Sequence, residues 1–221
     1  GKCKVCIPPQ HRQGNIEIPV WQEVYSPATT WLRDGSDKYF SIYNFHCLGA
    51  EKEYTENACD TVQFAGYDFC YGDFFGEINK ALMKNYAKKT IVVYVHGFNN
   101  TFNEAAMRAA QIKHDIRFDG EMVVYAWPSR RLVGYTAAEG NSEWTQTDLT
   151  TFLKKLLCNV GDVKIYLLAH SMGSRILMRS LADIISANPS KEKGYVGRCK
   201  EENRFPIDKI AGVILAAADL D

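Results

Sequence analysis

Hydrophobic residues follow two alternating patterns through the second half of the chain. Short, continuous apolar runs are typical of strands buried in a parallel sheet. Between them lie segments whose apolar residues recur every three or four positions, the spacing of one helix face. The runs that predict strands are residues 91–95, 122–127, 163–168 and 210–217, and the stripes that predict helices lie within residues 75–86, 105–116, 149–157 and 176–185.

This alternation predicts an α/β fold with a mostly parallel sheet sandwiched by helices. In such a sheet the carboxyl ends of the strands share one edge, and ligands bind there. The polar segments that follow the predicted strands are therefore candidates for a functional site. They are residues 96–100, residues 127–131, Ser171 and Asp219.

Residues 1–90 have a different character. Proline, glycine and asparagine interrupt short apolar runs there, which predicts edge strands joined by loops. A helix that begins near Asp73 leads from this part into the core. The runs that predict the edge strands are residues 5–7, 16–18 and 39–48.

Length and composition favour one domain. A chain of 221 residues, 46% of them hydrophobic, is long enough to bury one sizeable core. We therefore expect a single domain over residues 1–221, in which residues 91–221 form the core of the fold.

The charge balance excludes some classes of partner. Lysine and arginine number 26, as do aspartate and glutamate, so the formal net charge is zero. No long-range field then attracts nucleic acid or an anionic membrane surface. The apolar runs are also shorter than the roughly 20 residues of a membrane-spanning helix. We expect no nucleic-acid partner and no integral membrane segment, and the oligomeric state stays open.

Seven cysteines, five of them in the first 70 residues, raise the questions of metal binding and disulfides. The Cys3-x-x-Cys6 pair resembles half a zinc site, but no second pair completes four ligands. We expect no metal and no cofactor. If the protein is exported, a disulfide is expected among Cys47, Cys59 and Cys70. Localisation is left open.

The segment Ala169-His170-Ser171-Met172-Gly173 has the spacing of a nucleophile elbow. Small residues two positions either side of a serine let the backbone turn sharply from strand to helix, which leaves the hydroxyl at the apex. The start of the helix places the N–H of Met172 beside that hydroxyl, where it can stabilise an oxyanion. The alternative is an ordinary serine that caps the helix.

Four segments at successive strand ends, VHGFNN, YAWPS, LLAHSMG and LAAAD, resemble motifs of the α/β-hydrolase superfamily. More narrowly, they resemble a bacterial α/β-hydrolase family of unknown function whose relatives are lipases and esterases. The resemblance covers about residues 90–221 and, more loosely, the beginning of the chain. It implies that Ser171 is the nucleophile and that the backbone N–H groups of Phe98 and Met172 form an oxyanion hole. Gly97 fits this role, because its backbone can approach a ligand closely.

Further roles follow from the resemblance. His96 and Trp127 are expected on the substrate-binding side of the site, with His96 ordering its loop through hydrogen bonds. Asp219 is the candidate for the acid of the triad, and Asp221 is the alternative. Residues 129–143 are expected to form a long loop, either a lid over the site or a solvated basic loop.

The triad is incomplete in this chain. The family order is serine, then an acid, then histidine, yet no histidine follows Ser171. The resemblance implies a further strand and a histidine-bearing loop, so we expect a chain truncated after the sixth strand. Arg175 is expected at the surface, and the side chain of His170 is expected to point away from the serine hydroxyl.

These observations lead to three hypotheses. The first is a serine hydrolase that cleaves carboxylic esters, small or lipid, through an acyl-enzyme on Ser171. The second is a non-catalytic binding or scaffold module that keeps the α/β-hydrolase fold without a complete triad. The third is a redox-regulated domain built on the cysteine-rich beginning of the chain.

Overall fold

The computed structural model divides the chain into two compact units. The first is Gly1–Glu77 with Asn103–Asp119, and the second is Ile78–Phe102 with Gly120–Asp221. The single domain over the whole chain stays a prediction. The described residues are 2–6, 12–14, 41–46, 71–84, 89–129, 134–187, 199 and 205–219.

The first unit contains a pair of antiparallel strands, β1 (Lys2–Cys6) and β2 (Ser41–His46). They confirm strands close to two of the three segments that the N-terminal apolar runs predict, and residues 16–18 lie outside the described residues. Most of helix α3 (Phe102–Asp115) also belongs to this unit. Helix α2 (Tyr71–Lys84) begins in the first unit and ends in the second.

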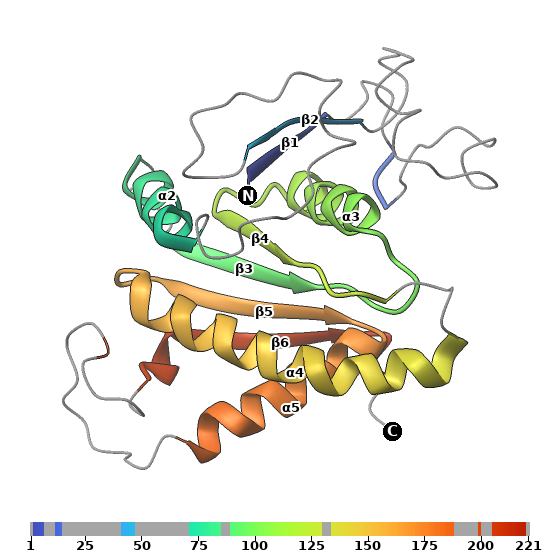
Figure 1. Ribbon diagram of the computed structural model, residues 1–221. Coiled ribbons are helices and arrows are strands. Elements are labelled where there is room, and N and C mark those ends of the chain that lie inside the picture. The colour runs from blue at the N-terminus through green and yellow to red at the C-terminus, as the bar shows by residue number, and fades with distance from the viewer. Residues whose placement is uncertain are drawn as a thin grey trace. The chain divides into compact units, whose positions relative to one another are not determined.

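The second unit is built on a four-stranded sheet in the order β4-β3-β5-β6 (Figure 1). All neighbouring strands are parallel, which confirms the predicted parallel sheet. The central strand β3 is buried from Ile91 to Val95, as its continuous apolar run predicts. The strands are β3 (Thr90–Val95), β4 (Glu121–Tyr125), β5 (Lys164–His170) and β6 (Ile210–Ala216).

The register brings the carboxyl ends of the strands to one edge. Val95 pairs with Tyr125 on one side and with Ala169 on the other, and Ala169 pairs with Leu215. The arrowheads of β3, β5 and β6 therefore point the same way in Figure 1. Every candidate site residue follows or ends one of these strands.

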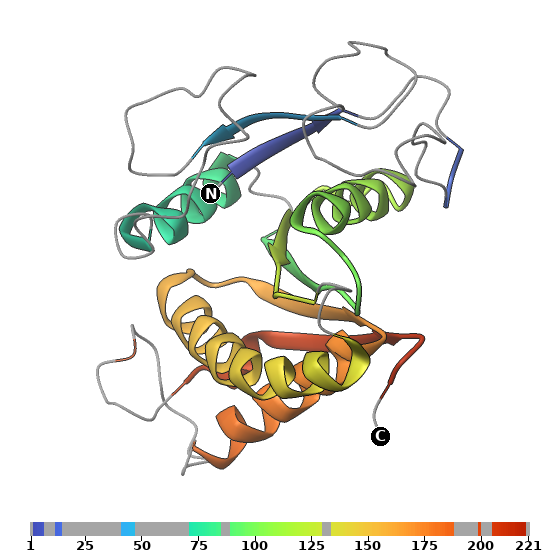
Figure 2. The same ribbon diagram turned by 45° about the vertical axis from the view of Figure 1, so that its right-hand side comes forward.

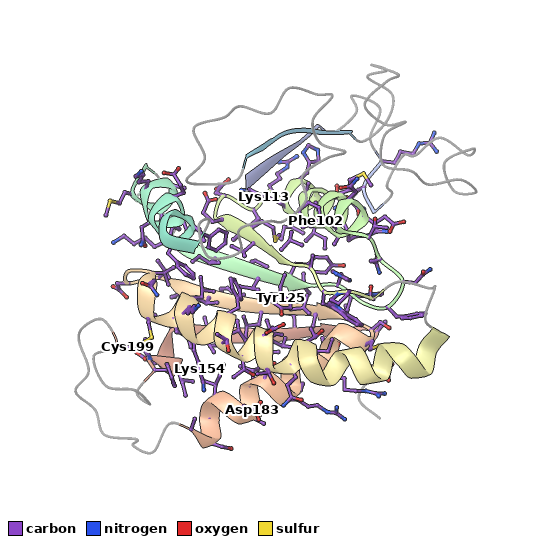
Figure 3. The ribbon with its side chains drawn as sticks, in the orientation of Figure 1. Phe102, Lys113, Tyr125, Lys154, Asp183 and Cys199 are labelled. Atoms are coloured by element: carbon purple, nitrogen blue, oxygen red, sulfur yellow. A yellow bond between two sulfur atoms is a disulfide. The ribbon has the colours of Figure 1, made fainter. Side chains whose placement is uncertain are left out.

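Helices α4 (Gly134–Asn159) and α5 (Met172–Ser186) lie on the same side of the sheet and pack against each other (Figures 1 and 2). Their apolar faces are buried, which accounts for the stripes seen in the sequence. Asp183 of α5 joins the helices through polar contacts, since Gln146 and Thr150 of α4 donate to its carboxylate (Figure 3). The buried residues of these faces are Leu149, Leu153, Leu156, Leu157, Ile176, Leu177, Leu181 and Ile184.

Two sequence expectations about the helices are wrong. Residues 129–143 do not form one long loop, because α4 already begins at Gly134. Its first turns lack an apolar stripe, so periodicity gave no signal. The stripes also placed Ile116 and Ile185 inside, yet they are 61% and 59% exposed. Ile116 follows the end of α3, and Ile185 lies beside the inward-facing Ile184 rather than on the buried face.

A disulfide joins Cys158, near the end of α4, to Cys199 (Figure 3). The two cysteines are 41 residues apart, and closing a loop of that length stabilises a fold by roughly 4 kcal/mol. Bonds of this kind persist in oxidising compartments. The predicted disulfide among the cysteines at positions 47, 59 and 70 lies outside the described residues.

Lys209 caps the carboxyl end of α4 from the segment before β6. Its ammonium group donates to the carbonyl oxygens of Leu157, at 2.9 Å, and Val160, at 2.7 Å. A cation is favourable there because the last carbonyls of a helix have no partner within it. Burial lowers the pKa of Lys209 from its ordinary 10.5, and the carboxylates of Asp208 and Asp162 act in the opposite direction.

Replacing Lys209 with methionine should lower the free energy of unfolding by about 1 kcal/mol near neutral pH, because two carbonyls lose a charged donor. The lowered pKa of the folded state means that the unfolded chain binds more protons as pH approaches 10.5. The unfolding free energy of the wild type should therefore rise with pH relative to Lys209→Met. Urea titrations at neutral pH and at about pH 10 measure both effects. Equal free energies of the wild type and Lys209→Met at neutral pH would contradict the contact, and a difference between them that does not change with pH would contradict the lowered pKa.

Candidate active site

A strained turn joins β5 to α5 at Ser171. The serine has φ 50° and ψ −130°, a backbone conformation that L residues with a side chain rarely adopt. Backbone hydrogen bonds hold it, since Ser171 donates to Ala216 O at 3.0 Å and Ser174 donates to Ser171 O at 2.8 Å. The Ser171 side chain makes no capping hydrogen bond to α5, which argues against the helix-cap alternative.

Gly173 allows the first turn of α5 to lie directly on the end of β3. A Cβ at this position would stand 2.5 Å from the carbonyl oxygen of His96 and 2.8 Å from that of Val95. These oxygens belong to the backbone and cannot move aside as a flexible side chain does. The small residue expected two positions after the serine is therefore required by the close approach of helix and strand.

Gly97 brings the loop after β3 against the same turn. A Cβ on Gly97 would stand 3.0 Å from Ser171 Cβ and 2.9 Å from His170 Nδ1. The loop and the elbow thus lie so close together that Gly97 has no room for a side chain, and Phe98 is the next residue in the chain. Met172 N stands at the first position of α5, where helix N–H groups have no partner within the helix.

Comparison with known families agrees with this geometry. The family model of alpha/beta hydrolases of unknown function (DUF900) matches residues 74–221, which is more than half of the chain. The chain belongs to this family. None of the curated proteins compared with it matches. In this α/β hydrolase the resemblance read from the four strand-end motifs is confirmed at the level of the family.

His96 and Trp127 form a buried pair beside the elbow. The backbone N–H of Trp127 donates to His96 Nε2 at 3.0 Å, so Nε2 is an acceptor and Nδ1 carries the proton. His96 Nδ1 then donates to Gly97 O at 2.8 Å. The indole N–H of Trp127 donates to His96 O at 2.7 Å, and the two rings stack at 5.6 Å. These contacts agree with the expectation that His96 orders its loop, while the substrate-binding role of both residues stays a prediction.

Asp219, the candidate acid, lies at the end of β6 and forms an ion pair with Arg175. The Arg175 Nη2 donates to Asp219 Oδ1 at 2.8 Å. The expectation of a surface arginine is wrong, because Arg175 is only 9% exposed. The backbone of Asp219 also reaches the elbow, where its N–H stands 3.4 Å from Ser171 O. Its role as the acid stays a prediction, and Asp221 lies outside the described residues.

The histidines of the described residues do not supply an evident base for the elbow serine. Both ring nitrogens of His96 are engaged, Nδ1 with Gly97 O and Nε2 with the backbone N–H of Trp127. His170 is exposed at the end of β5, and His114 is exposed in the last turn of α3. His11 and the side chain of His46 lie outside the described residues. The histidine base of the triad stays a prediction.

Sequence reasoning placed Asn100 and Ser129 in the polar segments that follow two strands, but it did not assign them the role of holding the loop after β3. Asn100 ends this loop, and Ser129 follows β4 with its side chain fully buried. Asn100 N donates to Ser129 Oγ, which in turn donates to Asn100 O, and the side-chain amide of Asn100 donates to Phe98 O. A signal was present in the sequence, because small polar residues at the ends of neighbouring parallel strands are expected to meet.

No group of three or more histidine, cysteine, aspartate or glutamate residues that could hold a metal ion occurs within the described ranges. Among the helices of the described residues, none has the length and apolar character needed to cross a membrane.

Proposed function

We propose that this α/β hydrolase is a serine hydrolase that cleaves carboxylic esters, small or lipid, through an acyl-enzyme on Ser171. The observation that carries the proposal is the backbone conformation of Ser171, φ 50° and ψ −130°, between a parallel strand and a helix. Strain of this kind costs about 1–3 kcal/mol and persists where the surrounding structure enforces it, often at active sites. Here Gly173 and Gly97 permit the packing that enforces it.

The chemistry follows from the placement of the hydroxyl. Ser171 Oγ attacks the ester carbonyl carbon, and the bond between that carbon and the alcohol oxygen breaks. The serine proton passes through a base to the alcohol, which leaves. Water then attacks the acyl-enzyme, which releases the carboxylic acid and returns the proton to Ser171. One ester and one water thus give one acid and one alcohol.

The carbonyl oxygen becomes an anion in both tetrahedral intermediates. The proposed donors to that oxygen are the N–H groups of Phe98, which follows Gly97 in the chain, and of Met172, which follows Ser171. Met172 N also stands at the positive end of the α5 dipole. The loss of one such donor typically costs about 3 kcal/mol of transition-state stabilisation.

The rival function is a non-catalytic module that retains the fold. Two observations favour it: the carboxylate of Asp219 is paired with Arg175, and both ring nitrogens of His96 are engaged. A serine without a base is a weak nucleophile. The two functions therefore differ in whether Ser171 reacts.

A fluorophosphonate probe separates them. We expect the folded, full-length protein to gain one adduct, formed as Ser171 Oγ displaces fluoride, and peptide mass spectrometry to place it on Ser171. The exposed Ser186, at the end of the same helix, should stay unmodified. Heat-denatured protein is the control and should not react. An unmodified Ser171 in folded protein would support the non-catalytic module.

A further inference from the structure

The loop after β3 is held by the side chain of Asn100. Its Nδ2 donates to Phe98 O at 3.0 Å and to Gly97 O at 3.3 Å. Since both partners are carbonyl oxygens, only the NH₂ end of the amide can face them. Gly97 O also accepts from His96 Nδ1 at 2.8 Å. The side chains of Asn100 and His96 therefore both donate to the carbonyl oxygen of Gly97.

That peptide unit contains the proposed oxyanion donor. The carbonyl of Gly97 and the N–H of Phe98 belong to one planar group, and the described residues contain no cis peptide bond. In a trans peptide the C=O and the N–H point in opposite directions. When Asn100 and His96 hold Gly97 O, they therefore aim the Phe98 N–H away from themselves.

Ser129 in turn holds Asn100. Asn100 N donates to Ser129 Oγ at 3.2 Å, and Ser129 Oγ donates to Asn100 O at 3.1 Å. Ser129 also holds the neighbouring residue of the loop, because Asn99 N donates to Ser129 O at 2.9 Å. Ser129 is fully buried, so water does not compete for these bonds. The end of β4 thus anchors the loop of β3.

We propose that Asn100, anchored by Ser129, is a positioning residue that aims the Phe98 N–H at the oxyanion formed on Ser171. This inference rests on the proposed esterase function. A donor that is fixed before reaction needs no reorganisation in the transition state. The role of Asn100 therefore concerns the rate of the chemical step more than substrate binding.

The test compares Asn100→Ala and Asn100→Asp with wild type in hydrolysis of p-nitrophenyl butyrate by the full-length protein. Asn100→Asp keeps the shape of the side chain but has no N–H to donate. We expect kcat to fall about 10- to 100-fold in both variants, with KM within about threefold. If the side chain acted by packing alone, Asn100→Asp would retain the wild-type kcat, and the inference would be overturned.

Two further variants separate positioning from stability. Lys209→Met removes the cap of α4 outside the site, so it should lower the unfolding temperature and leave kcat unchanged. Ser129→Ala removes the hydroxyl anchor without touching the amide, so kcat should fall by about 3- to 10-fold even if the Asn100 variants fail to fold. A wild-type kcat in Ser129→Ala would count against the inference. If the wild type does not hydrolyse the ester, the proposed function is wrong, and this inference is then wrong as well.

Discussion

Replacing Ser171 with alanine is expected to lower the turnover of an ester substrate by about 10⁴-fold or more, to the background rate. The reason is that alanine has no oxygen to form the proposed acyl-enzyme, while the proposed oxyanion donors and the fold are unchanged. KM cannot be compared at that level, so the initial rate of p-nitrophenyl butyrate hydrolysis is the measurement. The fluorophosphonate adduct should disappear in the same variant.

The matched control is Ser186→Ala. Ser186 is an exposed serine on the same helix, so this variant should keep the wild-type rate and the adduct. Circular dichroism of Ser171→Ala should equal that of the wild type. Turnover that survives in Ser171→Ala would mean that another residue carries the chemistry, and the proposed function would then be wrong.

Replacing Gly173 with alanine should destabilise the protein, although the same change stabilises most helices. In an exposed helix interior, alanine is favoured over glycine by about 1 kcal/mol. Here the added Cβ would stand 2.5 Å from His96 O and 2.8 Å from Val95 O, so helix α5 must move away from β3. We expect a loss of about 2–3 kcal/mol in the free energy of unfolding, measured by urea titration.

The rate of ester hydrolysis should also fall in Gly173→Ala. The shift would carry Met172 N and Ser171 away from the loop after β3, and a misplacement of about 1 Å can cost about 10²-fold in rate. The control is Gly161→Ala, because a Cβ there meets nothing within 4 Å. Gly161→Ala should change neither stability nor rate by much. A Gly173→Ala protein as stable as the wild type would show that the helix and strand are not in the contact described here.

The ion pair of Arg175 with Asp219 affects whether Asp219 can serve as the acid of the triad. An acid of the triad must orient a histidine, whereas Asp219 Oδ1 already accepts from Arg175. The pair also joins α5 to the end of β6, next to the backbone contact between Asp219 N and Ser171 O. Its position gives Asp219 a structural contact at the elbow whichever residue serves as the acid.

The sheet and the elbow were predictable because their signals are local. A run such as residues 91–95 is apolar at every position only if both faces of the strand are buried, and that constraint is visible within five residues. The spacing around Ser171 is equally local, since the turn itself excludes large residues two positions away. The beginning of α4 was missed for the opposite reason, because its first turns carry no apolar stripe.

The amino-acid sequence by itself determined the α/β class, the parallel strands and the position of the strained serine. Only the tertiary structure decided which distant residues meet: Arg175 with Asp219, Asn100 with Ser129, and Cys158 with Cys199, which lie 44, 29 and 41 positions apart. Periodicity reports which side of an element is buried, but it carries no information about the partner on another element. Such pairs depend on register and helix packing, which arise only when the whole sheet is assembled.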